Sequence, residues 1–305
     1  MTTSNSSPTK PRRVRRLLLG AITIIILIVG ATGATLVSRD HSAISLLRAG
    51  QEIDIGGREM FIHCMGAGSP TVLLEHGLGS NGHEWHTVQN VVAGDTRVCW
   101  TSRAGMGLSD RAPETTPRTA NDAVDDLTAL LDAVEMSGPY VLVGHSFGGY
   151  VVRLFTARRP DDVVGVILVD STHEDQADVL RNRLSPAAWE ELAGFLGADN
   201  PENIDLTASA REVQLLSNLG STPLVVLEAT EQSTDADAGG ISSASATEID
   251  AAMAQLWPEL QADLASLSTR RIHRTIPDSG HFIQNDDPQA VIDAITWILD
   301  EVAEP

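Results

Sequence analysis

The chain has 305 residues, two cysteines and a formal net charge of −20. Its length is sufficient for one large α/β domain, and two cysteines exclude a small scaffold held together by many disulfides. Five of the 21 basic residues lie within 1–38, a segment that has no acidic residue. The rest of the chain therefore carries 16 basic and all 41 acidic residues. A body this acidic repels polyanions, and we therefore expect no nucleic-acid partner.

The N-terminal segment has the pattern of a membrane anchor. Residues 1–16 are polar and then basic, and residues 17–38 form an uncharged run of 22 residues rich in Ile, Leu and Val. A helix of this length crosses a bilayer, and the basic flank predicts a cytoplasmic N-terminus with the rest of the chain outside. A cleaved signal peptide is the alternative, with small residues at 31–34 as a cleavage site, but the apolar run exceeds the usual length of a signal peptide. Both interpretations predict an exported body, joined through a linker at 39–50.

From residue 51 onward, short apolar segments alternate with helical patterns. The predicted strands are 51–55, 59–64, 71–75, 97–101, 140–143, 163–169, 224–228 and 271–276. Helices with one apolar face are predicted at 121–136, 150–159, 248–266 and 288–302. This alternation is typical of a mostly parallel sheet, here of eight strands, with helices on both faces.

Residues 171–222 interrupt the alternation between two core strands. The segment is helix-like and acidic, and it contains Pro186 and Pro201. An insertion that follows a strand end lies over the edge of the sheet where substrates bind, so we expect a helical cap or lid there. The core then consists of 51–170 and 223–305, with a predicted loop at 230–247.

The segment 140–149 carries the most specific motif. An apolar strand runs into the sequence G-H-S-F-G at 144–148, and a helical pattern follows. Strand, G-x-S-x-G and helix together predict a sharp, strained turn that exposes the oxygen of Ser146 above the sheet. An ordinary glycine-rich loop is the other interpretation, but this context favours Ser146 as a nucleophile.

Four separated signatures make the chain, from about residue 51 to its end, resemble an α/β-hydrolase. The signatures are His76-Gly77, the pattern Arg103/Gly105/Gly107/Ser109, the G-x-S-x-G motif around Ser146, and Ser279-Gly280-His281. The chain departs from the family at Ser102, where an Asp often precedes the arginine. That position supports the loop rather than the chemistry.

The resemblance implies roles for several of these residues. A serine hydroxyl needs a base near neutral pH, and His281, which follows Ser146 in chain order, would be that base. His76 and His145 are motif neighbours, of which His76 would order its loop by hydrogen bonding. The backbone N–H groups of Leu78 and Phe147 would form the oxyanion hole.

The acid that orients His281 has several candidates. In some lipases of the family it ends the strand after the nucleophile helix, which here is the position of Asp170. A carboxylate at the end of a buried strand needs a charged or hydrogen-bonding partner, which favours Asp170. A helix N-cap or an anchor for the lid are its other possible roles. Other members carry the acid after the next strand, which leaves Glu228, Glu231, Asp235 and Asp237 open.

No metal or cofactor is expected. His83 and His86 could share a helix face, but no C-x-x-C and no paired Cys/His spacing predicts a zinc site. Cys64 and Cys99 fall on the second and fourth predicted strands, which are neighbours in the family's sheet order. In an exported body they could form a disulfide, and two buried free thiols are equally compatible with the sequence.

These features predict a membrane-anchored serine hydrolase that cleaves carboxylic esters through an acyl-enzyme with a Ser146-His281-Asp170 triad. A cap would shield an apolar cleft, so we expect a small-molecule, lipophilic ester as substrate. Epoxide hydrolases and haloalkane dehalogenases of this fold need a carboxylate at position 146, so the serine there argues against these two activities. A peptidase or thioesterase would share the mechanism, whereas a ligand-binding or signalling protein of this fold would show little turnover.

Overall fold

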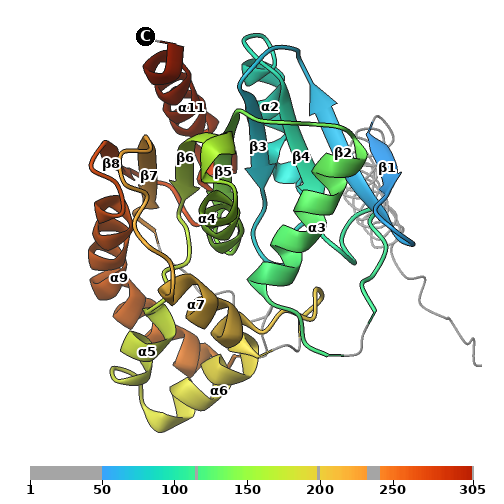
Figure 1. The fold of residues 1–305 in the computed structure, drawn as a ribbon. Coiled ribbons are helices and arrows are strands. Elements are labelled where there is room, and N and C mark those ends of the chain that lie inside the picture. Colours follow the sequence, from blue (N-terminus) through green and yellow to red (C-terminus); the bar gives the residue numbers. More distant parts are fainter. Residues whose placement is uncertain (1–49, 114–115, 198–199, 232–240, 304–305) are drawn as a thin grey trace, which may run out of the picture. The chain divides into compact units, whose positions relative to one another are not determined.

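A computed structural model of the chain describes residues 50–113, 116–197, 200–231 and 241–303 (Figure 1). The predicted anchor at 17–38 and its basic flank lie outside these residues. Among the described helices, none is both long and apolar enough to cross a membrane.

Eight strands form one sheet in the order β1-β2-β4-β3-β5-β6-β7-β8. Their bounds are β1 Gln51–Asp54, β2 Glu59–Met65, β3 Thr71–Glu75, β4 Val98–Ser102, β5 Tyr140–His145, β6 Val163–Val169, β7 Leu224–Ala229 and β8 Arg271–Ile276. β2 is antiparallel to β1 and to β4, and every other neighbouring pair is parallel. The predicted eight-stranded, mostly parallel sheet is thereby confirmed.

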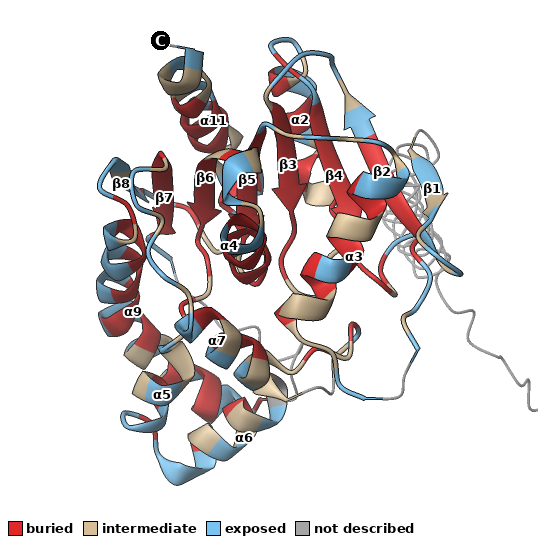
Figure 2. Cartoon of the chain, viewed as in Figure 1, coloured by how far each residue is buried: buried red, intermediate tan, exposed pale blue. Residues whose placement is uncertain are grey.

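Helices cover both faces of this sheet. The helices α3 (Ala120–Ala133), α4 (Gly148–Arg158) and the C-terminal end of α9 (Ser243–Ser266) share one apolar core. The helices α2 (His86–Val92) and α11 (Pro288–Ala303) pack against each other and against the sheet's other face. Because both faces are covered, β3 and β5 are buried along their whole length (Figure 2). Helix α2 carries no clear signal in the sequence, because its seven residues are too few for a helical period.

Three helices occupy the insertion between β6 and β7: α5 (Gln176–Arg181), α6 (Pro186–Leu196) and α7 (Leu206–Gln214). α7 packs on α3 and α4, whereas α5 and α6 pack on α9, which begins five residues before the predicted start at 248. Figure 1 shows α5 and α6 grouped with the lower end of α9. We call this group the helical layer. Its apolar cluster consists of Leu180, Leu184, Ala188, Leu192, Ile241, Ala246, Ile249, Met253, Leu256, Trp257 and Leu260.

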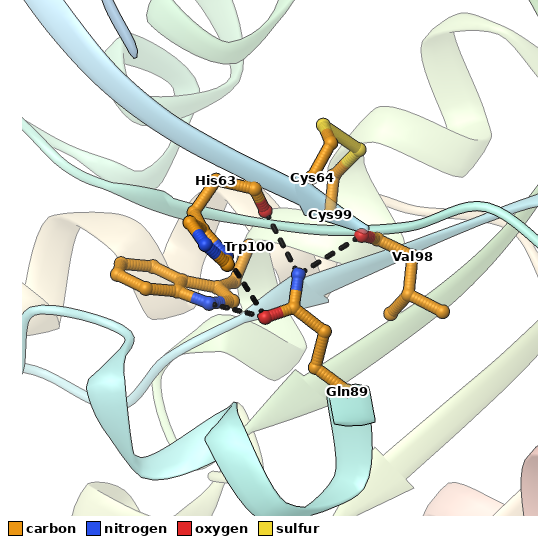
Figure 3. Close-up of a disulfide and its surroundings, with 6 residues drawn as sticks. All are labelled: His63, Cys64, Gln89, Val98, Cys99 and Trp100. Atoms are coloured by element: carbon orange, nitrogen blue, oxygen red, sulfur yellow. Dashed lines mark hydrogen bonds between the residues drawn. A yellow bond between two sulfur atoms is a disulfide. The ribbon is translucent and has the colours of Figure 1, made fainter. Parts of the chain in front are cut away.

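Cys64 and Cys99 form a disulfide between the antiparallel strands β2 and β4 (Figure 3). The two residues are directly opposite in the register, with their Cα atoms 4.1 Å apart. Next to the disulfide, the side-chain amide of Gln89 in α2 donates to the carbonyls of His63 and Val98. Of the two interpretations left open by the sequence, the structure has the disulfide.

Short elements complete the part that the structure describes. They are the 3-10 helices η1 (His83–Trp85) and η2 (Pro160–Asp162) and the helix α10 (Ile283–Asp286). η1 contacts α10, which follows directly on the loop that carries His281.

Candidate active site

Ser146 occupies the sharp turn between β5 and α4. Its φ of 50° lies in the left-handed region, which non-glycine residues adopt only under strain. A Cβ on Gly144 would lie 2.6 Å from the Gly148 carbonyl oxygen, and one on Gly148 would lie 2.6 Å from that of Glu75. These positions admit no side chain, so the flanking glycines allow the turn that presents the serine.

Asp170 follows β6 and is completely buried, with a φ of 41°. Its Oδ2 lies 2.7 Å from Nδ1 of His281. Its Oδ1 accepts hydrogen bonds from Nε1 of Trp257 at 2.7 Å and from the N–H of Ala229 at 2.9 Å. These donors offset the unfavourable desolvation of a buried carboxylate. The structure therefore brings together the predicted acid and the predicted base.

The other acid candidates do not contact His281 in the described part of the chain. Glu228 lies in β7, and its Oε2 is 2.8 Å from Nε2 of His273. Glu231 donates its backbone N–H to the carbonyl of Ser279. Asp235 and Asp237 lie outside the described residues.

His145, directly before Ser146, contacts His281 in two ways. Its Nε2 lies 2.8 Å from the backbone carbonyl oxygen of His281, and the two ring centroids are 4.7 Å apart. Burial lowers the pKa of His145 well below its usual range, so the ring is neutral. The proton on Nε2 can then be donated to the carbonyl, and this bond holds the His281 loop against the serine turn.

The two predicted oxyanion donors are available. Within the described residues, neither the N–H of Leu78 nor that of Phe147 has a hydrogen-bond acceptor. Phe147 is the N-cap of α4, where the helix dipole adds positive potential. Gly77, which precedes Leu78, lies against the serine, because a Cβ on it would be 3.3 Å from Cβ of Ser146.

A buried arginine holds the loop that contains Leu78. The guanidinium of Arg103 donates to the carbonyls of His76 and Gly77 at 2.7 and 2.8 Å. It also forms two bonds with the carboxylate of Glu202, Nε to Oε2 at 2.7 Å and Nη2 to Oε1 at 2.8 Å. Glu202, which comes from the insertion, accepts the N–H of Gly79 at 2.7 Å as well.

The charges in this network are set by burial and pairing. Burial alone would raise the pKa of Glu202, but the guanidinium of Arg103 outweighs it and lowers that pKa. Burial raises the pKa of Glu75, whose Oε2 lies 3.3 Å from Nη1 of Arg103. Burial also lowers the pKa of His76 to about 3. The loop is therefore built on the Arg103 guanidinium, which is paired with the carboxylates of Glu202 and Glu75, and on a neutral histidine.

His76 orders this loop as expected from its place in the motif. Its Nδ1 lies 2.8 Å from the Gly77 carbonyl oxygen, and its Nε2 accepts the N–H of Arg103 at 3.2 Å. Ser102, the departure from the family pattern, donates its hydroxyl to the carbonyl of Asn81 at 2.7 Å. Ser102 thus supports the neighbouring loop.

Among the described residues outside the site, His83 and His86 lie close together. The rings of His83 and His86 stack with centroids 6.1 Å apart. Over the ranges that the structure describes, no group of three or more His, Cys, Asp or Glu side chains is arranged to hold a metal ion.

Two residues that contact the site, Glu202 and Trp257, were not predicted from the sequence. Glu202 is one of many acids in an acidic segment, and Trp257 was one apolar position on a predicted helix. Neither stands in a motif that could have identified it.

Known proteins resemble this chain in sequence and fold. A sequence profile described as the alpha/beta hydrolase fold matches residues 70–254. A probable transporter of Hormonema carpetanum, efuK, is 27% identical over 299 residues, covering 82% of this chain and 42% of the relative. Lipase LipV of Mycobacterium tuberculosis is 36% identical over 104 residues, covering 34% of this chain and 38% of the lipase. The chain thus matches less than half of the length of either relative.

Among solved structures, a thermophilic esterase from Thermogutta terrifontis has a similar fold. The TM-score is 0.57 at 23% identity, and the match covers 83% of this chain and 98% of the esterase.

Proposed function

Because the chain belongs to the alpha/beta hydrolase fold family, we propose that it is a serine hydrolase which cleaves carboxylic esters through an acyl-enzyme. The observation that carries this proposal is the 2.7 Å contact between Nδ1 of His281 and Oδ2 of Asp170, beside the strained turn at Ser146. An esterase and a lipase among the similar proteins support an ester as the substrate.

The reaction begins with attack of the Ser146 hydroxyl oxygen on the carbonyl carbon of the ester. Nε2 of His281, the ring nitrogen that Asp170 does not engage, takes the serine proton. The oxyanion of the tetrahedral intermediate accepts hydrogen bonds from the N–H groups of Leu78 and Phe147. The intermediate then breaks its bond to the alcohol, which leaves with the proton from His281.

Water completes the cycle. His281 takes a proton from a water molecule, whose oxygen attacks the acyl carbon on Ser146. The second intermediate collapses to release the carboxylic acid, and the proton on His281 returns to the serine. Asp170 holds the imidazole in the required tautomer and stabilises its protonated form in both halves.

The surroundings of His281 support a lipophilic substrate. Phe282 is 45% exposed, and its ring centroid lies 5.6 Å from that of His281 and 5.0 Å from that of His145. An exposed aromatic ring at this position favours an apolar substituent on the ester. Residues 171–222 act in this proposal as the cap over the site.

We also propose that residues 17–38 anchor the protein in a membrane with its catalytic domain outside the cytoplasm, or direct its secretion. The Cys64–Cys99 disulfide supports export, because disulfides persist mainly in oxidising compartments. Fractionation of cells followed by protease treatment of intact spheroplasts tests this: degradation of the body without lysis is expected.

The catalytic proposal is tested by labelling the purified full-length protein with a fluorophosphonate probe, which reacts with activated serines. We expect covalent labelling of the wild type and none of Ser146→Ala. A series of p-nitrophenyl esters of increasing acyl length then defines the acyl preference. Folded wild-type protein that neither takes up the probe nor hydrolyses any ester of the series would contradict the proposal.

A further inference from the structure

The side chain of Trp257 contacts the acid of the proposed triad directly. Its Nε1 lies 2.7 Å from Oδ1 of Asp170, and only 3% of Trp257 and none of Asp170 is exposed. We propose that Trp257 is a positioning residue that orients Asp170 toward His281 and moderates its negative charge. This inference rests on the proposed function, since it assigns a role within that triad.

The contacts of the carboxylate show how this orientation arises. Trp257 and the N–H of Ala229 both donate to Oδ1, while Oδ2 faces Nδ1 of His281. Two donors on one oxygen set the rotation of the carboxylate about its Cβ–Cγ bond. The other oxygen is thereby directed at the imidazole.

The same side chain belongs to the helical layer. Trp257 lies in α9, and its ring is part of the apolar cluster that includes Leu180 of α5 and Leu192 of α6. Packing of α5 and α6 against α9 therefore fixes the indole whose N–H meets Asp170. In this way the helical layer helps to set the geometry of the acid, 87 residues before Trp257 in the chain.

Loss of the indole N–H has a predictable effect on the pH dependence. A hydrogen-bond donor withdraws negative charge from a carboxylate, and without it Asp170 attracts the protonated form of His281 more strongly. A higher pH is then needed to free the base. The acid limb of kcat/KM against pH, which reports the base of the free enzyme, moves upward.

The other titratable groups around His281 are unaffected by this change. Burial keeps His145 neutral, with its pKa well below the usual range. Asp286 accepts the N–H of Gly280, and Glu228 is paired with His273. Their contacts do not involve Trp257, so a shift of the acid limb reports on Asp170 and His281.

The test compares Trp257→Phe with Trp100→Phe in the full-length protein. Trp100 is a matched control, because it is 1% exposed and its Nε1 donates to Oε1 of Gln89 at 3.0 Å, away from the triad. We expect Trp257→Phe to lower kcat roughly tenfold and to move the acid limb upward by about half a pH unit. Trp100→Phe should lower the melting temperature and leave the acid limb in place.

A second variant guards against misfolding of Trp257→Phe. Replacement of Trp257 by benzothienylalanine puts sulfur in place of the ring N–H and retains the shape, so it should shift the acid limb in the same direction. An acid limb that stays at the wild-type position or moves to lower pH in both Trp257 variants would overturn the inference. Failure of the proposed function is distinct, because the wild-type protein itself would then show no probe labelling.

Discussion

Glu202 and Arg103, 99 residues apart in the chain, form a buried ion pair beneath the loop that carries Leu78. Both oxygens of the carboxylate engage the guanidinium, and Oε1 also accepts the N–H of Gly79. Glu202 comes from the insertion and Arg103 from the core. The insertion therefore takes part in holding the proposed oxyanion loop.

Glu202→Gln should weaken both stability and turnover. The amide removes the charge that balances a buried guanidinium, which we expect to destabilise the protein by about 3 kcal/mol. Displacement of the loop should lower kcat roughly tenfold, less than the loss of an entire oxyanion donor. Urea unfolding and ester hydrolysis measure the two effects.

The matched control is Glu174→Gln, which removes the charge partner of the buried Arg153. This pair is also bidentate, with contacts of 2.5 and 2.7 Å, but it does not touch the residues 76–79. We expect a lower stability with kcat near that of the wild type. Equal losses of kcat in the two variants would show that Glu202 has no specific link to the site.

Stability should fall as the pH decreases below about 6.5, the ordinary pKa of histidine. His76 has its pKa lowered to about 3 by burial, so between these values the unfolded chain binds a proton that the folded protein does not. The stability that His76 contributes is therefore fully present above the pKa of histidine in the unfolded chain. It decreases with falling pH, by on the order of 5 kcal/mol at pH 3. Glu202, whose pKa is lowered by Arg103, adds a further loss of stability at the lowest pH values.

Urea unfolding at a series of pH values measures this slope. His76→Asn should flatten it between pH 4 and 6.5, because the variant lacks the group that protonates on unfolding. An unchanged slope in a folded variant would assign the acid sensitivity to other groups, such as His145.

Asp170→Asn should lower kcat on the order of 10⁴-fold if Asp170 acts like the acid of the protease triad. The amide has the shape of the carboxylate but cannot hold the protonated imidazole. Asp235→Asn, at a position outside the described residues, is the comparison. Near-wild-type turnover of Asp170→Asn with an inactive Asp235→Asn would show that the acid is misassigned.

Ser146→Gly should be inactive and more stable than Ser146→Ala. Alanine keeps the Cβ that is strained at a φ of 50°, whereas glycine adopts this conformation freely. Relief of the strain should raise the free energy of unfolding of the glycine variant by about 1 kcal/mol. The extra entropy of glycine in the unfolded chain offsets part of this gain. Equal melting temperatures for the two variants would mean that the strain relieved by glycine is no larger than its entropic cost in the unfolded chain.

The sequence by itself determined the features that depend on local patterns. Short apolar runs predicted the central strands β3, β5 and β6, because a strand buried on both faces needs apolar residues throughout. The glycines at 144 and 148 predicted the serine turn, since the backbone there approaches too closely for a side chain. The chain's motifs also indicated His281 and favoured Asp170 among five acids.

Only the tertiary structure decided which of the distant groups meet. The contact between Asp170 and His281 spans 111 residues, and those of Trp257 and Glu202 with the site span 87 and 99. Such pairs follow from strand order and from the packing of the insertion on the core, which no local pattern encodes. A buried carboxylate or guanidinium needs a partner, but the sequence does not say which one, because the partner is selected by the fold that surrounds it.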